Sequence, residues 1–233
     1  MGVIFYRTLR SAARFIRIQA IRQTQLNADR ADRDDGFVLA CTHISHIEPL
    51  VLSAAMRRQV HWVSRREFYR FRISQFVLNA IGAVEIDRFG SALVGVRAAA
   101  KLAAAGQCVG IFPEGGVAQG QDSVLSGGAI KGGMCSIAID ANVPIVPVVM
   151  LGTDILTSVR SWIPPPRKQV CFAFGRDICP PASGESRHAR RVQMTGAVEQ
   201  EFRRVYSELV STLDIGHSQM TAVLRNQSIG SCR

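Results

Sequence analysis

A histidine and a glutamate five positions apart are the two side chains of this 233-residue chain best placed to do chemistry together. They are His43 and Glu48, in the segment ACTHISHIEP at residues 40–49. A neutral imidazole near pH 7 can take a proton from a hydroxyl group. A carboxylate on its second ring nitrogen fixes the tautomer and stabilises the imidazolium that forms. The pair therefore predicts a general base beside its orienting partner.

A short buried strand and a helix are predicted to position this pair. Residues 37–41, FVLAC, form an apolar run after a charged segment, which favours a strand. Residues 48–58 are predicted to be helical, with Pro49 in the first turn, where its missing N–H is harmless. His43 then lies on the connecting loop and Glu48 at the helix N-terminus. Such loops at strand ends are where α/β folds bind ligands.

The length and the residue pattern predict a single α/β domain. With 47% hydrophobic and 20% charged residues, the chain can bury a sizeable core. The apolar, β-branched run at residues 143–151 is predicted to be a core strand, although its two prolines require an edge, a bulge or a strand start. The glycine-rich stretch at residues 120–128 is predicted to be a weakly ordered loop. Further predicted strands are residues 60–64, 83–87, 108–112 and 169–174, and further helices are residues 73–80, 91–105, a segment that follows Gly133 and ends near Asp140, and residues 192–213.

Residues 1–26 are predicted to be an amphipathic helix that associates with a membrane. Projecting residues 3–26 on a helix puts apolar side chains on one seam and arginines on the other side, toward anionic headgroups. A helix packed on its own domain, with a solvated basic face, explains the same pattern. Residues 27–35 are then a polar linker, residues 36–215 the main domain, and residues 216–233 a disordered tail.

The charge of the chain favours acidic partners. The 28 Lys and Arg against 18 Asp and Glu give a net charge of +10. Nucleic acid, an anionic membrane surface and a phosphorylated substrate all fit this balance. Residues 65–72, RREFYRFR, interleave arginines with aromatic rings. Such a segment can clamp nucleic acid, bind a phosphate or dock on a membrane.

The cysteine and histidine spacings do not predict a metal site. The six cysteines form no CxxC pair, and most lie in apolar runs, which favours buried, reduced thiols. His43 and His46 make an HxxH pair without the HExxH pattern or a third ligand at suitable spacing, so His46 is interpreted as a loop residue. No metal and no cofactor are expected. The start, MGVIFYRTLR, does not resemble a secretory peptide, and no run of 18 apolar residues occurs, which favours a peripheral or monotopic protein at the cytoplasmic face of a membrane.

Four separated segments resemble the glycerophospholipid acyltransferase family. The first sequence block of the family is a histidine, four residues and an aspartate, and here Glu48 follows His43 at that interval. The other blocks occur in the family's order within about residues 41–152. They are SRREF at residues 64–68 with Gly82 and IDR at residues 86–88, FPEGG at residues 112–116, and PIVPV at residues 144–148.

The resemblance implies a fold and an activity. The fold would be glycerol-3-phosphate acyltransferase-like, with a mixed, mostly parallel sheet flanked by helices. The activity would be O-acyl transfer from acyl-CoA or acyl-carrier protein to a lysophospholipid hydroxyl, with 1-acyl-sn-glycerol-3-phosphate as the expected acceptor and phosphatidate as the product. His43 would be the base and Glu48 its partner. No acyl-enzyme is expected, because the substrate hydroxyl takes the place of a serine and the chain contains no GxSxG motif.

Two departures from the family pattern affect the expected binding residues. Glu48 replaces the usual aspartate with a side chain one methylene longer, which can still reach an imidazole. Gly116 and Val117 stand where the family has a threonine and a phosphate-binding arginine. The candidates to supply that contact are Arg66, Arg88 and Lys131.

The FPEGG segment is expected to shape the acceptor site. Glu114 would organise this loop, while Gly115 and Gly116 let backbone amides approach an anion. A turn carboxylate that only caps backbone N–H groups is the alternative interpretation of Glu114.

Three other functions remain as alternatives. The first is an acyltransferase for a different lipid acceptor, which the valine at position 117 motivates. The second is a catalytically impaired family member. The third, from a different class, is a basic nucleic-acid-binding module, which leaves the His43 and Glu48 pairing unexplained. A lipid acceptor, a thioester donor and an anionic membrane are therefore the expected partners, and nucleic acid is not.

Overall fold

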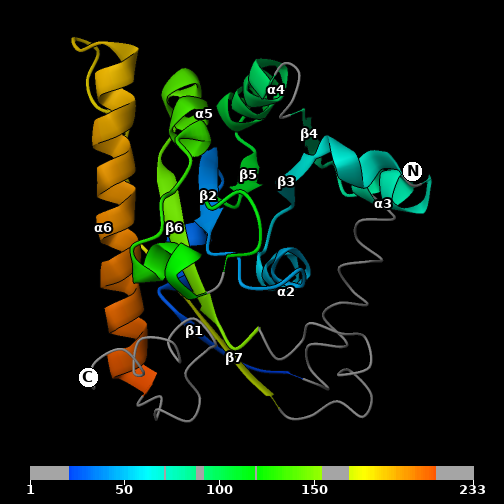
Figure 1. The fold of residues 1–233 in the computed structure, drawn as a ribbon, viewed down its shortest axis with the longest axis vertical. Helices are drawn as coiled ribbons and strands as arrows, with labels where there is room; N and C mark the ends of the chain where they lie inside the picture. Colours follow the sequence, from blue (N-terminus) through cyan, green and yellow to red (C-terminus); the bar gives the residue numbers. More distant parts are fainter. Residues whose placement is uncertain (1–20, 71, 88–91, 119, 154–167, 214–233) are drawn as a thin grey trace.

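The computed structural model describes residues 21–70, 72–87, 92–118, 120–153 and 168–213. Within these residues a seven-stranded sheet has the order β1-β7-β6-β2-β5-β3-β4 (Figure 1). The strands are β1 (Ile21–Leu26), β2 (Phe37–Cys41), β3 (Val60–Arg65), β4 (Val84–Ile86), β5 (Cys108–Ile111), β6 (Ile145–Leu151) and β7 (Lys168–Phe174). The helices are α2 (Glu48–Ala55), α3 (Arg72–Ala80), α4 (Ala92–Ala104), α5 (Gly133–Ala141) and α6 (Arg187–Leu213). The 3-10 helices are η1 (Ala28–Ala31), η2 (Arg66–Arg70), η3 (Gly120–Asp122) and η4 (Val124–Ser126).

Helices cover both faces of the sheet, which explains why every residue of β2 is apolar. Val38 and Ala40 pack into a core with α4, α5 and α6. Phe37, Leu39 and Cys41 pack on the opposite face with α2. A parallel strand that is covered on both faces has no solvent side, so it reads as a continuous apolar run. The predicted strand is confirmed with its predicted limits.

The strand directions gather four loops at one edge of the sheet. Of the neighbouring pairs among the described strands, only β6 and β7 run antiparallel, so the sheet is mixed and mostly parallel, as expected. Because β2, β3, β5 and β6 are parallel, the segments that follow them leave the sheet at the same edge. These segments carry His43, Arg66, the FPEGG motif and Thr153.

The predicted N-terminal helix is wrong at its C-terminal end. Residues 21–26 form β1, which pairs in parallel with β7. This long-range pairing overrides the local helical period of the segment. The predicted linker at residues 27–35 is tied to the domain, because Arg30 donates to the carbonyl of Phe174 at 2.9 Å and Ala31 is buried. Residues 1–20, which hold the rest of the predicted helix, and all of the predicted tail, residues 216–233, lie outside the described residues.

The prediction that both prolines near β6 require an edge, a bulge or a strand start is wrong for Pro147. β6 is an interior strand between β7 and β2. The carbonyls of Pro144 and Val148 accept N–H groups from β2, so alternate residues bond to β2 and the nitrogen of Pro147 faces the β7 side. The register with β7 begins at Val148, so the missing N–H of Pro147 falls outside it.

Two further segments differ from their predicted form. Residues 120–128 contain η3 and η4 rather than a weakly ordered loop, and Ser123 and Val124 are fully buried. α6 begins at Arg187, five residues before the predicted start. In the part of the chain that the structure describes, no helix is both long enough and apolar enough to cross a membrane.

Candidate active site

The loop between β2 and α2 brings His43 and Glu48 together. Nδ1 of His43 lies 2.8 Å from Oε2 of Glu48. The Glu48 side chain is fully buried and His43 is only 9% exposed. Glu48 is the first residue of α2, with Pro49 in the first turn, so the helix fixes its backbone. The arrangement leaves Nε2 of His43 as the ring nitrogen that faces away from the carboxylate, where a general base must act.

The second oxygen of Glu48 is held from two directions. Oε1 accepts hydrogen bonds from the N–H of Ser45 at 2.7 Å and from the hydroxyl of Thr153 at 2.5 Å. A buried carboxylate requires such partners. Thr153 lies 105 positions after Glu48 and was not predicted from the sequence. Its signal was its place after β6, which runs parallel to β2 and ends at the same edge.

Glu114 links the FPEGG turn to the backbone of His43. Its Oε2 accepts the N–H of His43 at 2.7 Å. Its Oε1 accepts the hydroxyl of Ser123 at 3.2 Å and the N–H of Val124 at 3.0 Å. Burial raises the pKa of Glu114, while these hydrogen bonds act in the opposite direction. Glu114 thus caps backbone N–H groups, the alternative that the sequence left open, and it fixes the loop that carries His43.

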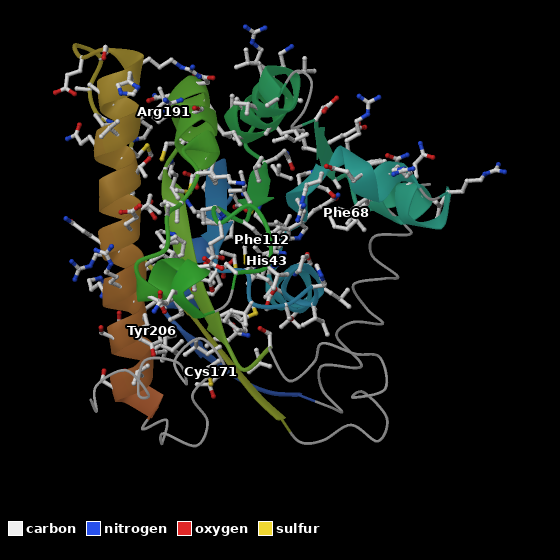
Figure 2. All side chains as sticks on the ribbon, viewed as in Figure 1. His43, Phe68, Phe112, Cys171, Arg191 and Tyr206 are labelled. Carbon is white, nitrogen blue, oxygen red and sulfur yellow. The ribbon has the colours of Figure 1, made fainter. Side chains whose placement is uncertain are left out.

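Two aromatic rings stack in series beneath the imidazole. The ring centroids of His43 and Phe112 are 3.9 Å apart, with an interplanar angle of 21°. Trp62 stacks on Phe112 at 4.9 Å and 8°. The indole N–H of Trp62 donates to the hydroxyl of Ser53 in α2 at 2.8 Å. Figure 2 shows His43 and Phe112 side by side at the edge of the sheet. One face of the imidazole is therefore covered, and its orientation is set by Phe112 as well as by Glu48.

The two glycines of FPEGG are required for different structural reasons. Gly115 has a φ of +76°, and its N–H closes a tight turn on the carbonyl of Phe112 at 2.9 Å. A β-carbon at Gly116 would come 3.2 Å from Nη2 of Arg65, so this glycine makes room for a guanidinium. Arg65 also lies over the ring of Phe68, at 5.7 Å from its centroid. Arg65 belongs to the SRREF segment, but it was not predicted from the sequence to be a binding residue.

Arg66 and Lys131, two of the three cations selected from the sequence, lie in different places. Arg66 is 66% exposed and pairs with Asp87 at 2.6 Å and with Glu85 at 3.5 Å. The hydrogen bond with Asp87 raises the pKa of Arg66, so its charge is already balanced. Arg88 lies outside the described residues. The side chain of Lys131 is exposed and lines a groove between α4, α5 and α6.

His46 and the described cysteines make no hydrogen bond to His43 or Glu48. His46 is exposed, and its ring is nearly perpendicular to that of His43 at 5.9 Å. Across the described ranges, no group of three or more His, Cys, Asp or Glu residues could hold a metal ion. Burial raises the pKa of Cys108 to about 12. The buried thiols are Cys41, Cys108, Cys135 and Cys171.

Comparison with known proteins decides the family. A family model described as Acyltransferase matches residues 20–151, which is more than half of the chain and includes every residue of the site described above except Thr153. This chain belongs to the acyltransferase family.

Two known proteins are similar to this chain. It is 29% identical over 127 residues to a 1-acyl-sn-glycerol-3-phosphate acyltransferase of Bacillus subtilis (strain 168), a match that covers 54% of this chain and 61% of the relative. Its fold is similar to that of the crystal structure of the 1-acyl-sn-glycerophosphate (LPA) acyltransferase PlsC from Thermotoga maritima. The TM-score is 0.64 at 15% sequence identity, and the match covers 87% of this chain and 80% of the other. This likeness confirms the expected fold.

Proposed function

We propose that this acyltransferase moves a fatty acyl group from a thioester donor to the hydroxyl of a lysophospholipid, with 1-acyl-sn-glycerol-3-phosphate as the first acceptor to test. The observation that carries the proposal is the 2.8 Å contact between Nδ1 of His43 and Oε2 of Glu48. This contact lies directly beside the FPEGG turn, because Glu114 binds the N–H of His43. The match to the Bacillus subtilis relative supports the choice of acceptor.

The proposed reaction is a single acyl transfer without an acyl-enzyme. Nε2 of His43 takes the proton of the acceptor hydroxyl as the oxygen attacks the thioester carbonyl carbon. The carbon–sulfur bond then breaks, and the imidazolium gives its proton to the departing thiolate. Glu48 remains ionised and holds the proton on Nδ1, so that Nε2 starts unprotonated. General-base assistance of this kind contributes roughly 10²–10⁴-fold to the rate.

The guanidinium of Arg65 lies beside Gly116 of the FPEGG turn. The family's phosphate-binding arginine is absent at position 117, where a valine stands. The guanidinium of Arg65 fills the neighbouring space, against Gly116. An arginine can bind a phosphate through two parallel N–H groups, which gives both affinity and geometry. We therefore assign the acceptor's phosphate to Arg65 ahead of Arg66, whose charge is paired with Asp87.

An acceptor panel tests this assignment. Purified enzyme would receive labelled acyl-CoA with lysophosphatidate, with other lysophospholipids, or with monoacylglycerol, which lacks the phosphate. We expect phosphatidate to be the main product, and Arg65→Ala to raise the KM for lysophosphatidate while leaving that for monoacylglycerol unchanged. Equal KM changes for both acceptors would contradict a phosphate contact. Salt-dependent binding of single-stranded nucleic acid without any acyl transfer would contradict the enzyme itself.

A different lipid acceptor is the second candidate. The observation that favours it is Val117, which is 38% exposed where the family has a cation. Activity confined to acceptors without a phosphate would favour this candidate and would exclude the assignment of Arg65.

In either case, we propose that the enzyme acts at the cytoplasmic face of an anionic membrane, as a peripheral or monotopic protein. Sedimentation with anionic and with neutral vesicles measures that attachment.

A further inference from the structure

A groove separate from the His43 loop lies among three helices on one face of the sheet. It has a volume of about 740 Å³, within the range of small-molecule sites. Its walls come from α4, from the start of α5 and from the N-terminal half of α6. The residues that matter for its chemistry are Leu93, Lys131, Gly132, Arg187, Arg191 and Val192.

Cations dominate the charged side chains of this groove. Lys131, Arg187 and Arg191 line it, against the single carboxylate of Glu199. Arg187 donates three hydrogen bonds to the carboxylate of Asp140, at 2.7, 2.9 and 3.1 Å, so part of its charge is balanced. Arg191 is different, because its contact at 3.4 Å is to a ring nitrogen of the neighbouring His188 and not to a carboxylate. The groove therefore favours an anion beside Arg191.

Glycine allows the cation of α6 to reach the start of α5. A β-carbon at Gly132 would lie 3.1 Å from Cδ of Arg191. The aliphatic part of Arg191 thus packs across the backbone just before α5. Figure 2 shows Arg191 where α5 and α6 approach each other.

The same groove presents apolar surface to the solvent. Leu93 is 57% exposed and Val192 is 58% exposed, and these two side chains come from different helices. A flat ring bound between them would remove apolar area from water. Apolar walls beside cations suit a ligand that carries a base at one end and phosphates at the other.

The groove is connected to the reacting centre through the backbone. The N–H of Lys131 donates to the carbonyl of Pro113 at 2.8 Å. The next residue, Glu114, binds the N–H of His43. A ligand anchored at Lys131 thus contacts the segment that shapes the FPEGG turn.

We propose that this groove binds the adenosine 3′,5′-bisphosphate portion of an acyl-CoA donor. The adenine ring lies between Leu93 and Val192, and the phosphates bind Arg191 and Lys131. Lys131, expected from the sequence to contact the acceptor, is thereby assigned to the donor. The inference rests on the proposed acyl transfer and selects acyl-CoA over acyl-carrier protein.

Titration calorimetry with adenosine 3′,5′-bisphosphate tests the groove without any turnover. We expect the nucleotide to bind the full chain, and Arg191→Ala to weaken binding about tenfold, as for the loss of one charge-assisted hydrogen bond. The matched control is Arg97→Ala, which removes an exposed cation of α4 outside the groove. It should leave the affinity unchanged. No binding by the wild-type chain, or equal losses in the two variants, would overturn the proposal.

Kinetics with two donors separates this inference from the proposed function. Arg191→Ala should raise the KM for acyl-CoA about tenfold and leave the KM for acyl-pantetheine, which lacks the nucleotide, unchanged. An equal rise for both donors would refute the nucleotide assignment while leaving acyl transfer intact. A defect confined to acyl-carrier protein as donor would also refute it. Nucleotide binding in the groove without transfer from any donor would leave the groove in place and contradict the proposed function.

Discussion

Replacing Glu48 by glutamine tests the role of the carboxylate with almost no change of shape. Oε1 of Glu48 accepts from Ser45 and Thr153, and Oε2 faces Nδ1 of His43. A glutamine has one oxygen and one NH₂ group. Its oxygen must face the two donors at the Oε1 position, so its NH₂ group faces Nδ1. Nδ1 then has to be the unprotonated nitrogen, and Nε2 carries the proton and cannot act as a base.

The expected loss follows from this change of tautomer. We expect Glu48→Gln to lower kcat by about 10²–10⁴-fold, the range in which a positioned general base contributes. The KM values for donor and acceptor should change little, because the Glu48 side chain is fully buried and cannot touch a substrate. A loss in kcat alone is therefore the signature of a positioning residue.

The assay follows the thiol released from acyl-CoA, with thermal unfolding of each variant as the test of folding. Glu48→Asp is the matched control, since it keeps the carboxylate and restores the family's residue. We expect it to retain more activity than Glu48→Gln. A Glu48→Gln enzyme with kcat within about tenfold of the wild-type value would show that the Glu48 carboxylate does not set the tautomer of His43. So would a loss that appears equally in both variants.

Four other substitutions test separate parts of the structure. Phe112→Leu removes the ring that stacks on the imidazole and should lower kcat by up to about tenfold, the equivalent of a 0.5–1.5 kcal/mol aromatic contact, in steady-state assays. Because burial raises the pKa of Glu114, its contribution to stability is complete below the unfolded pKa and is lost as pH rises through the folded pKa. Urea unfolding should therefore show Glu114→Gln gaining stability relative to wild type as pH rises above about 4, the usual pKa of a glutamate, and a constant difference would contradict this. Gly95→Ala should destabilise the domain by about 1–3 kcal/mol, because its β-carbon would come 2.6 Å from the carbonyl oxygen of Glu85. Gly196→Ala, with no atom within 4 Å of its β-carbon, should stabilise α6 by about 0.5–1 kcal/mol, and the same sign for both glycines in thermal unfolding would be inconsistent with the packing.

Local patterns predicted the centre of this protein well. The buried strand β2 and the start of α2 follow from a continuous apolar run and from a proline in a first helical turn. The five-residue interval between His43 and Glu48 is short enough that one strand, one loop and one helix decide whether the side chains meet. The contact could therefore be predicted without knowledge of the rest of the chain.

Contacts between distant segments could not be read from those patterns. Thr153 reaches Glu48 only because β6 lies beside β2, and β1 exists only because β7 offers it a partner. Buried Val124 in the glycine-rich stretch owes its order to Glu114. The direction of an arginine side chain is likewise a tertiary property, so Arg65 could not be distinguished from Arg66 before the fold was known.

The rate of acyl transfer by a His43→Ala variant tests whether His43 is the general base. Wild type and variant would be compared with acyl-CoA and lysophosphatidate, at matched thermal stability. We predict that the variant loses about 10²–10⁴-fold in kcat, because no other base contacts the Glu48 carboxylate in the part of the chain that the structure describes. Wild-type turnover by the His43→Ala enzyme would show that His43 is not the base.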